Sequence, residues 1–443
     1  MIKQSYGLIG YPLEHSLSNV LHDILFKLKK AKCDYTIMPV EIKDLSEKLD
    51  ILRHTLNGFN VTIPYKTTIL DYLDYVDNEA KIIGAVNTLK TNEGFLNGYN
   101  TDIEGIDYTF KKDSIEVKKK SALVIGYGGA ALSAVYYLKR NGAKSITVTG
   151  RDMQKLIDFQ KNYSYKNDIP IDIASIKNIT GSFQIVINCT PAGMSPHFDE
   201  MPININKIAD IEYYFDTIYN PRKTLLLKNF EEKNIRCRDG LLMLVVQAAR
   251  AQEIWNKNIK FSYDEIEKAY FELALYMFKS LAVENINVIS LTGFMGCGKT
   301  TVGKKLASLL GFTFIDTDLE IEKKYGSINM IFKTEGENKF REYETEILKS
   351  VLKNKNVVIS TGGGIIEKNS KLIKDKTFNI YLECDFFELS KRAYNKSRPL
   401  FKNLDETEEL YKKRLPFYEK NCHLKINSAD NIQSILLNIF SSI

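Results

Sequence analysis

The 443-residue chain has few cysteines, few histidines and no long apolar run. Its six cysteines are scattered without a C-x-x-C pair, and five histidines are too few to suggest a structural zinc site, so reduced thiols are expected. The longest apolar run, residues 241–249, is far shorter than the ~20 residues that a membrane span needs. Because the sequence opens almost directly on the strand-like GLIGYP, no signal peptide is expected. These absences predict a cytoplasmic enzyme with no membrane partner.

The chain also has little excess charge of either sign. A net charge of +6 is small for this length and is not a nucleic-acid signature. Hydrophobic residues make up 44%, as in ordinary soluble proteins, and the length is enough for two or three domains. The composition therefore predicts a multi-domain globular protein with no nucleic-acid partner.

The stretch GFMGCGKTT, residues 293–301, fits the phosphate-binding pattern G-x-x-x-x-G-K-[ST]. Residues 286–292 before it are typical of a buried strand, and residues 302–310 after it of an amphipathic helix. Together these elements point backbone N–H groups at an anion. A glycine-rich turn without a ligand is the alternative, which the agreement of pattern and context disfavours. We expect ATP or GTP here, with Lys299 at the β- and γ-phosphates and Thr300 on Mg²⁺.

Polar residues follow the predicted strands of the first hundred residues. Ser16 and Ser18 stand at a strand–helix junction, where they could cap the helix or bind a carboxylate. Lys66 follows a strand that a proline ends, and AVNTL (85–89) and GYNTD (98–102) place Asn and Thr inside apolar strands. Strands alternating with helices indicate an open α/β sheet, which binds ligands at the carboxyl ends of its strands. We interpret these clusters as one pocket for a polyhydroxylated ligand.

A second glycine-rich turn, GYGG at 126–129, opens a predicted strand–helix–strand unit. It approximates the dinucleotide fingerprint, which alone is a weak signal. The residue after the next strand decides the cofactor, because an acid there binds a ribose 2′-OH and an arginine accommodates a 2′-phosphate. Arg151 stands there and favours NADP, while Asp152 is interpreted as a helix cap.

Seven segments of residues 1–282 resemble, in order and spacing, the signatures of shikimate dehydrogenases: GLIGYPLEHSLS, NVTIPYK, AVNTL, GYNTD, INCTPAGM, FDTIYNPRKT and DGLLMLVVQA. The resemblance implies that Lys66 and Asp102 form the catalytic pair. It implies that the substrate is bound by Ser16, Ser18, Thr62, Asn87, Asp102, Tyr219 and Gln247, the two serines holding its carboxylate. It assigns NADP(H) to Gly126, Gly128, Gly129, Ala130 and Arg151. The family often has Asn-Arg-Thr where this chain has Gly-Arg-Asp at 150–152, so strict preference for NADP over NAD is left open.

The chemistry of ketone reduction agrees with the catalytic pair. Hydride transfer to a ketone leaves an alkoxide, which needs a proton as it forms. We assign Lys66 as the principal acid/base and Asp102 as the partner that orients the lysine and the substrate hydroxyl. A surface salt bridge between the two is the alternative.

Residues 286–443 resemble shikimate kinases through GFMGCGKTT, DTD (316–318), FKTEGENKFREYE (332–344), STGGG (360–364), SRPLF (397–401) and RLPFYEK (414–420). Taken singly, each arginine would be a surface residue and each aspartate a helix cap. The resemblance implies that shikimate is bound by Asp318, Arg341, Gly363, Gly364 and Arg414. It implies that ATP is bound by Gly293, Gly296, Cys297, Gly298, Lys299, Thr300, Thr301, Arg392 and Arg398. It assigns Mg²⁺ to Thr300 and Asp316, and the phosphoryl group to Lys299 and to Arg398 on a mobile lid. Asp318 is expected to orient, or deprotonate, the attacking hydroxyl.

The predicted fold is α/β throughout. Residues 1–104 with 240–282 are expected to form an open-sheet substrate domain, 105–239 a Rossmann-like NADP domain, and 286–443 a P-loop kinase domain with a parallel sheet, after a polar junction at 283–287. The predicted function is bifunctional: NADPH reduces 3-dehydroshikimate to shikimate, and Mg-ATP phosphorylates shikimate at its 3-hydroxyl, in aromatic amino-acid biosynthesis. An NAD-dependent quinate/shikimate oxidoreductase with a kinase of other specificity is the alternative, and a nucleotide-sensing scaffold is a third. The assembly state, a homodimer included, is left open.

Overall fold

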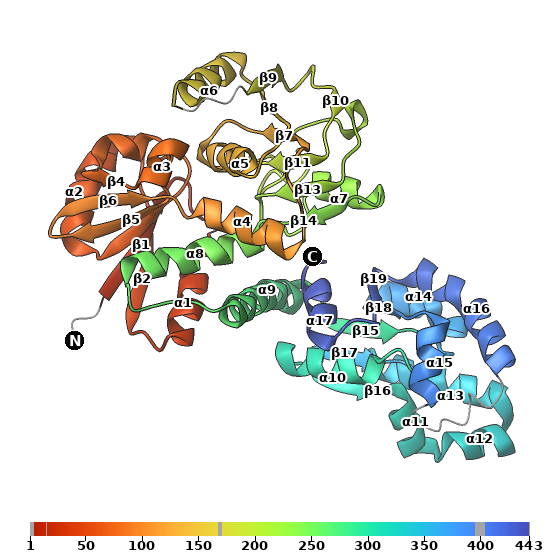
Figure 1. Cartoon of the computed structure of the whole chain (residues 1–443). Helices are drawn as coiled ribbons and strands as arrows, with labels where there is room; N and C mark the ends of the chain where they lie inside the picture. The colour runs from red at the N-terminus through yellow and green to blue at the C-terminus, as the bar shows by residue number, and fades with distance from the viewer. Residues whose placement is uncertain (1–3, 15, 167–170, 395–403, 443) are drawn as a thin grey trace. The chain divides into compact units, whose positions relative to one another are not determined.

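The computed structural model describes residues 4–14, 16–166, 171–394 and 404–442. The chain divides into two compact units, Met1–Leu273 and Ala274–Ile443, in which strands and helices alternate along the chain (Figure 1). The predicted α/β class is confirmed in both units. None of the six cysteines, all of which lie in the described part of the chain, forms a disulfide. Within the described part of the chain, no helix combines the length and the apolar character that crossing a bilayer requires.

The first lobe of the N-terminal unit is built on a mixed six-stranded sheet in the order β2-β1-β3-β5-β6-β4. Its strands are β1 (Gln4–Gly10), β2 (Cys33–Pro39), β3 (Gly58–Val61), β4 (Tyr75–Val76), β5 (Thr88–Asn92) and β6 (Phe95–Tyr99). Its helices are α1 (Ser18–Leu28), α2 (Leu45–Thr55), α3 (Asn78–Ile83), α4 (Asp102–Lys112) and α8 (Leu241–Trp255). Helices α4 and α8 lie side by side (Figure 1). A Cβ on Gly105 of α4 would be 2.8 Å from Met243 Cγ of α8. A late segment of the unit therefore completes its first lobe.

The second lobe carries an all-parallel six-stranded sheet in the order β14-β13-β11-β7-β8-β9. Its strands are β7 (Ser121–Ile125), β8 (Ser145–Gly150), β9 (Asp172–Ser175), β11 (Ile185–Asn188), β13 (Tyr213–Asp216) and β14 (Arg236–Arg238). Its helices are α5 (Gly129–Arg140), α6 (Met153–Lys166) and α7 (Leu225–Glu232), and β10 (Gly181–Ser182) pairs with β12 (Ile208–Ala209). The strand order reverses between β7 and β11, which is where open α/β sheets bind ligands.

Strand β7 shows why this lobe needs helices on both faces of its sheet. Ala122 and Val124 are buried in one core, with apolar residues of α5, whereas Leu123 and Ile125 are buried in another, with residues of α7. Side chains alternate across a strand, so a continuous apolar run must be covered on both sides. The run SALVI therefore requires the doubly wound arrangement that the lobe adopts.

The C-terminal unit has a parallel five-stranded sheet in the order β16-β17-β15-β18-β19, as predicted. Its strands are β15 (Val288–Thr292), β16 (Thr313–Asp316), β17 (Val357–Ser360), β18 (Phe378–Glu383) and β19 (Leu424–Asn427). Its helices are α10 (Lys299–Leu310), α11 (Thr317–Tyr325), α12 (Ile328–Thr334), α13 (Gly336–Val351), α14 (Ile366–Lys376), α15 (Phe386–Tyr394), α16 (Leu404–Asn421) and α17 (Ile432–Phe440). The glycine-rich stretch follows the carboxyl end of the central strand, β15.

Helix α9 (Tyr263–Asn285) contradicts the polar junction that we predicted at residues 283–287, because the helix continues through Asn285. Its last turns belong to the C-terminal unit, where Phe278 is buried and packs on Phe440 of α17 with ring centroids 5.2 Å apart. Apolar residues on one face of a helix keep it folded against a core even where its other face is polar. The polar composition of these residues suggested a linker, but burial of the apolar face of α9 lets the helix continue into them.

We predict that Phe278→Ala destabilises the C-terminal unit by about 3 kcal/mol, because it removes a buried ring and leaves a cavity beside Phe440. Hydrogen exchange of peptides from α17 and β15 in the full chain measures the loss. Leu281→Ala, on the same helix at a position 37% exposed, is the matched control and should change exchange little. Unchanged protection in Phe278→Ala would show that α9 contributes nothing to this core.

Candidate functional site

Lys66 and Asp102 form an ion pair in the first lobe. Lys66 follows β3 and Asp102 is the first residue of α4, with Nζ and Oδ2 2.6 Å apart. The Asp102 side chain is fully buried, whereas 15% of the Lys66 side chain is exposed. The helix N-terminus stabilises the carboxylate, since the helix dipole is positive there. The ammonium is therefore oriented by its partner and still accessible to a ligand.

Asn87 holds the other oxygen of this carboxylate. Its Nδ2 donates to Asp102 Oδ1 at 2.9 Å and to Gln247 Oε1 of α8 at 3.0 Å. The side-chain Oδ1 of Asn87 accepts from the backbone N–H of Thr101 at 2.8 Å, which sets the orientation of the side-chain amide. Asn87, Asp102 and Gln247, all predicted to bind substrate, thus form one hydrogen-bonded group.

The two serines meet at the start of α1. Their Oγ atoms are 3.1 Å apart, and Ser16 Oγ also accepts from the backbone N–H of Ser18 at 3.3 Å. Neither hydroxyl caps the helix, because Leu17 takes the capping position and no side chain bonds there. Tyr219 lies beside them through a hydrogen bond with the backbone of Leu17, and burial raises the pKa of Tyr219. Ser16 and Ser18 can therefore act together on a carboxylate.

Two glycines let the backbone close on these residues. A Cβ on Gly10 would lie 2.5 Å from Thr62 Cγ2, and one on Gly129 would lie 2.7 Å from Lys66 Cβ. Gly129 is the first residue of α5 in the second lobe, so a helix N-terminus suited to a pyrophosphate touches the lysine of the first lobe. The same turn contains the other predicted glycine-loop residues, Gly126, Gly128 and Ala130.

Arg151 and Asp152 come directly after β8, which neighbours β7 in the sheet. Arg151 is exposed. Asp152 Oδ1 accepts from the backbone N–H of Lys155 at 3.2 Å, in the first turn of α6. The interpretation of Asp152 as a helix cap is confirmed, because its carboxylate is hydrogen-bonded to the first turn of α6.

Asp216, at the end of β13, is a buried carboxylate that we did not predict. It accepts from the hydroxyls of Tyr214 and Thr224, both at 2.7 Å, and from Asn188 Nδ2 at 3.1 Å. Burial raises the pKa of Asp216 to about 6, and these hydrogen bonds oppose that rise. Because it stands just before the segment that carries Tyr219, it anchors that segment to the sheet. An aspartate at the end of an apolar strand was the available signal in the sequence.

In the C-terminal unit, residues 293–301 form a tight loop between β15 and α10. A Cβ on Gly293 would lie 2.6 Å from the carbonyl oxygen of Leu382. Gly298, at φ +99°, turns the chain into α10, which begins at Lys299 and not at the predicted residue 302. Lys299 Nζ donates to the carbonyl oxygen of Gly293 at 2.8 Å, inside the loop. The remaining predicted residues of the loop and its helix are Gly296, Cys297 and Thr301.

Thr300 and Asp316 are brought together beside this loop. Thr300 Oγ1 donates to Asp316 Oδ2 at 2.9 Å, while Asp316 Oδ1 accepts from the backbone N–H of Asp318 at 3.2 Å and caps α11. Among the described residues, no group of three His, Cys, Asp or Glu side chains could hold a metal ion. Mg²⁺ is commonly held by one or two protein oxygens together with phosphates and water. The two oxygens here fit an ion that binds with a nucleotide.

Three consecutive glycines after β17 bring the predicted acceptor residues together. A Cβ on Gly362 would lie 2.5 Å from Asp318 Oδ1, and one on Gly364 would overlap the guanidinium of Arg341. The middle glycine faces Arg414, whose Nη1 is 3.8 Å from the Cβ position. Burial and the neighbouring aspartate raise the pKa of Asp318. Only glycine lets the backbone lie this close to such side chains.

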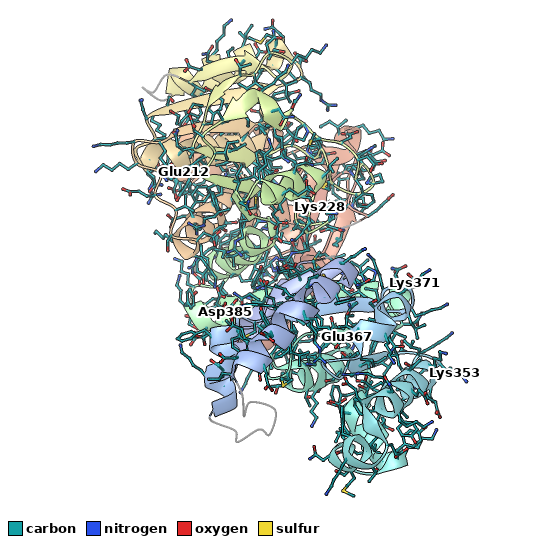
Figure 2. All side chains as sticks on the ribbon, turned by 90° about the vertical axis from the view of Figure 1, so that its right-hand side faces the viewer. Glu212, Lys228, Lys353, Glu367, Lys371 and Asp385 are labelled. Atoms are coloured by element: carbon teal, nitrogen blue, oxygen red, sulfur yellow. The ribbon has the colours of Figure 1, made fainter. Side chains whose placement is uncertain are left out.

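Glu344 and Glu367, which we did not predict, pair with the two arginines. Arg341 Nη1 donates to Glu344 Oε2 at 2.6 Å, and Arg414 Nε donates to Glu367 Oε1 on α14 at 2.7 Å (Glu367 is labelled in Figure 2). Burial raises the pKa of Glu344 to about 7, although the charge of Arg341 opposes the rise. The spacing of three residues on one helix could have revealed the first pair. The second pair joins segments far apart in the sequence.

Two further arginines were predicted to contact ATP. Arg392 of α15 donates from Nη2 to the carbonyl oxygen of Ser428, just after β19, at 2.9 Å. Parallel strands end at one edge of their sheet, so Arg392 lies at the same edge as the phosphate loop. Arg398 lies outside the described residues.

Family models match three stretches of the chain. Residues 8–89 match the model described as shikimate dehydrogenase substrate binding domain, residues 109–222 match shikimate / quinate 5-dehydrogenase, and residues 295–443 match shikimate kinase. A shikimate dehydrogenase (NADP(+)) of Clostridium beijerinckii is 38% identical over 254 residues, which are 57% of this chain and 92% of that protein.

Solved structures resemble the same part of the chain. A shikimate dehydrogenase from Peptoclostridium difficile has a TM-score of 0.55 and 34% identity, over 61% of this chain and 97% of that one. A shikimate 5-dehydrogenase from Thermus thermophilus, in complex with NADP(H) and shikimate, has a TM-score of 0.54 and 26% identity, over 61% and 99%. Almost the whole of each protein is matched by little more than half of this chain, and the kinase model covers most of the rest.

We predict that Glu344→Gln raises the free energy of unfolding of the C-terminal unit relative to the parent at pH 8, and does so much less at pH 5. The folded unit holds the pKa of Glu344 at about 7 against an ordinary 4.5, so between these values only the unfolded chain ionises this carboxyl. The folded parent then binds more protons and loses stability as pH rises through this window, by up to about 3 kcal/mol.

Hydrogen exchange of peptides from α13 at pH 5 and pH 8 measures this difference. Glu342→Gln, on the same helix with 65% of the side chain exposed, is the matched control. A difference between Glu344→Gln and parent that stays constant with pH would contradict the prediction.

Proposed function

Because this chain belongs to the shikimate dehydrogenase family and carries a shikimate kinase domain over residues 295–443, we propose that one polypeptide makes shikimate and then phosphorylates it. The proposed first reaction reduces 3-dehydroshikimate with NADPH. The second converts shikimate to shikimate 3-phosphate with Mg-ATP. Two arrangements carry the proposal. The Lys66–Asp102 ion pair lies beside one glycine loop, and Asp318 lies with Arg341 and Arg414 beside another.

The first site offers the groups that ketone reduction needs. Ser16 and Ser18 would donate to the substrate carboxylate, and Asn87 would bind a ring hydroxyl. Lys66 Nζ would give its proton to the oxygen that becomes the new alcohol. Asp102 would keep that ammonium in place and accept from a neighbouring hydroxyl. The site therefore combines a fixed proton donor with an anchor for the acid group.

NADP(H), when bound, supplies the hydride. Its pyrophosphate would lie at the N-terminus of α5, where Gly129 touches Lys66, and its adenosine ribose near Arg151. Support for NADP comes from the Clostridium beijerinckii relative, which is named for that cofactor, and from the use of Asp152 as a helix cap. An arginine with no acid free beside it favours a 2′-phosphate over a 2′-hydroxyl.

The second site offers the groups that phosphoryl transfer needs. Lys299 would exchange the loop carbonyls for phosphate oxygens, and Thr300 with Asp316 would hold Mg²⁺. ATP, when bound, supplies the phosphoryl group. Asp318 would orient the attacking hydroxyl, and the two arginines of the acceptor site would bind the carboxylate of shikimate. Arg392 beside the adenine, and Arg398 on the transferred group, complete the proposed site.

The domain limits belong to the same proposal. Residues 1–104 with 240–273 would bind the substrate of the first reaction, residues 105–239 its dinucleotide, and residues 286–443 both substrates of the kinase. Residues 274–282, which we assigned to the first of these domains, fold with the C-terminal unit. The enzyme is proposed to work in the cytoplasm on these small molecules, in aromatic amino-acid biosynthesis.

We predict that the two activities can be removed one at a time. Lys66→Ala should lower the reduction of 3-dehydroshikimate at least ~100-fold, because the alkoxide loses its proton donor, and should leave phosphorylation of added shikimate unchanged. Asp318→Asn should have the reverse effect. The measurement is a pair of assays of the full chain: NADPH oxidation with 3-dehydroshikimate, and formation of shikimate 3-phosphate from added shikimate with Mg-ATP.

Lys43→Ala, with 70% of the side chain exposed, and Glu342→Gln are the matched controls for the two units. A parent chain that oxidises NADPH but forms no shikimate 3-phosphate would refute the kinase half of the proposal. Normal reduction by Lys66→Ala would refute the catalytic assignment, and loss of both activities in either variant would indicate a structural role.

A further inference from the structure

Tyr127, the second residue of the glycine turn after β7, lies over the end of the neighbouring strand β8. A Cβ on Gly150, the last residue of β8, would be 2.6 Å from both Cδ1 and Cε1 of the Tyr127 ring. Real Cβ atoms do not come this close to a ring, so the ring can occupy this position only because residue 150 is glycine. The phenol thus occupies the space that a side chain at position 150 would take, one residue before Arg151.

The hydroxyl of Tyr127 is available to bind a ligand. It stands two bonds beyond Cε1, so it too is near the carboxyl end of β8. The ring is partly buried against the core of the lobe, but among the described residues the hydroxyl makes no hydrogen bond. Arg151 is exposed, and within the described chain it forms no ion pair, while Asp152 is engaged by α6. One neutral donor and one fixed positive charge are therefore free at the same strand end.

We propose that Tyr127 is a specificity-determining residue of the dinucleotide site, and that its hydroxyl, together with Arg151, binds a phosphate monoester on the adenosine ribose. The inference rests on the proposed NADP(H) function. In a doubly wound sheet the adenosine ribose lies at the carboxyl end of the strand beside the glycine turn, which here is β8. A phosphate accepts from both the phenol and the guanidinium, whereas a ribose hydroxyl leaves the guanidinium without an anion. Tyr127 thereby adds to the preference of Arg151 for a ribose phosphate over a ribose hydroxyl.

The test compares adenosine 2′,5′-bisphosphate with adenosine 5′-monophosphate, which differ only in the ribose phosphate, as ligands of the full chain in calorimetric titrations. Tyr127→Phe keeps the ring and removes the hydrogen-bond donor. It should weaken the affinity for the bisphosphate about 10-fold and change the affinity for the monophosphate less than ~2-fold. Unchanged bisphosphate affinity, or equal loss for both ligands, would overturn the role of Tyr127. A parent chain without preference for the bisphosphate would instead overturn the proposed NADP(H) function.

A second experiment tests the contact between the ring and Gly150. In the parent, Gly150→Ala should displace the ring and weaken the affinity for the bisphosphate about 10-fold. In the Tyr127→Ala background the same substitution should change this affinity little further. Equal effects in both backgrounds would show that the ring does not lie where the inference needs it. Emission of Trp255, the single tryptophan of the chain, reports the fold of the N-terminal unit in every variant, and kinase turnover should stay unchanged.

Discussion

Close approach of the backbone to charged side chains, which glycine alone allows, is the constraint on which both candidate sites depend. In the N-terminal unit a side chain at Gly129 would push the second lobe away from Lys66. In the C-terminal unit the glycines after β17 let the chain pass directly against Asp318 and Arg341. Each site needs main-chain N–H groups and ionised side chains around one small ligand, and any Cβ at these positions would separate them.

Burial of carboxyl groups at both candidate sites makes their pairing the second requirement. Asp102 is fully buried, and its two oxygens are bound by Lys66 and Asn87. Glu344 is buried against Arg341, and its raised pKa shows that burial outweighs the attraction of the arginine. An unpaired buried charge costs several kcal/mol, so each of these buried carboxyl groups needs its partner. The sites differ in how they would hold the same carboxylate: neutral serine hydroxyls in one and arginines in the other, which bind it more strongly.

Much of the fold and of both candidate sites could be predicted from short sequence patterns. The alternation of strands and helices predicted the α/β class, and the flanks of residues 293–301 predicted the loop between β15 and α10. The prediction of a junction failed at residues 283–285, which have a polar composition but belong to helix α9, whose Phe278 is buried in the C-terminal unit. A composition shift reports the exposed face of a segment, whereas its buried face decides whether it stays helical.

Local spacing was enough to identify the glycine loops, the cap at Asp152 and the residue types at each strand end, because these devices depend on the conformations of a few consecutive residues. Packing of distant segments was needed for the pairing of Arg414 with Glu367 and for the ring of Tyr127 over Gly150. Such partners meet only after the sheets and helices have assembled. No periodicity or motif within either segment records the distance to the other, so these contacts follow from the three-dimensional arrangement of the chain.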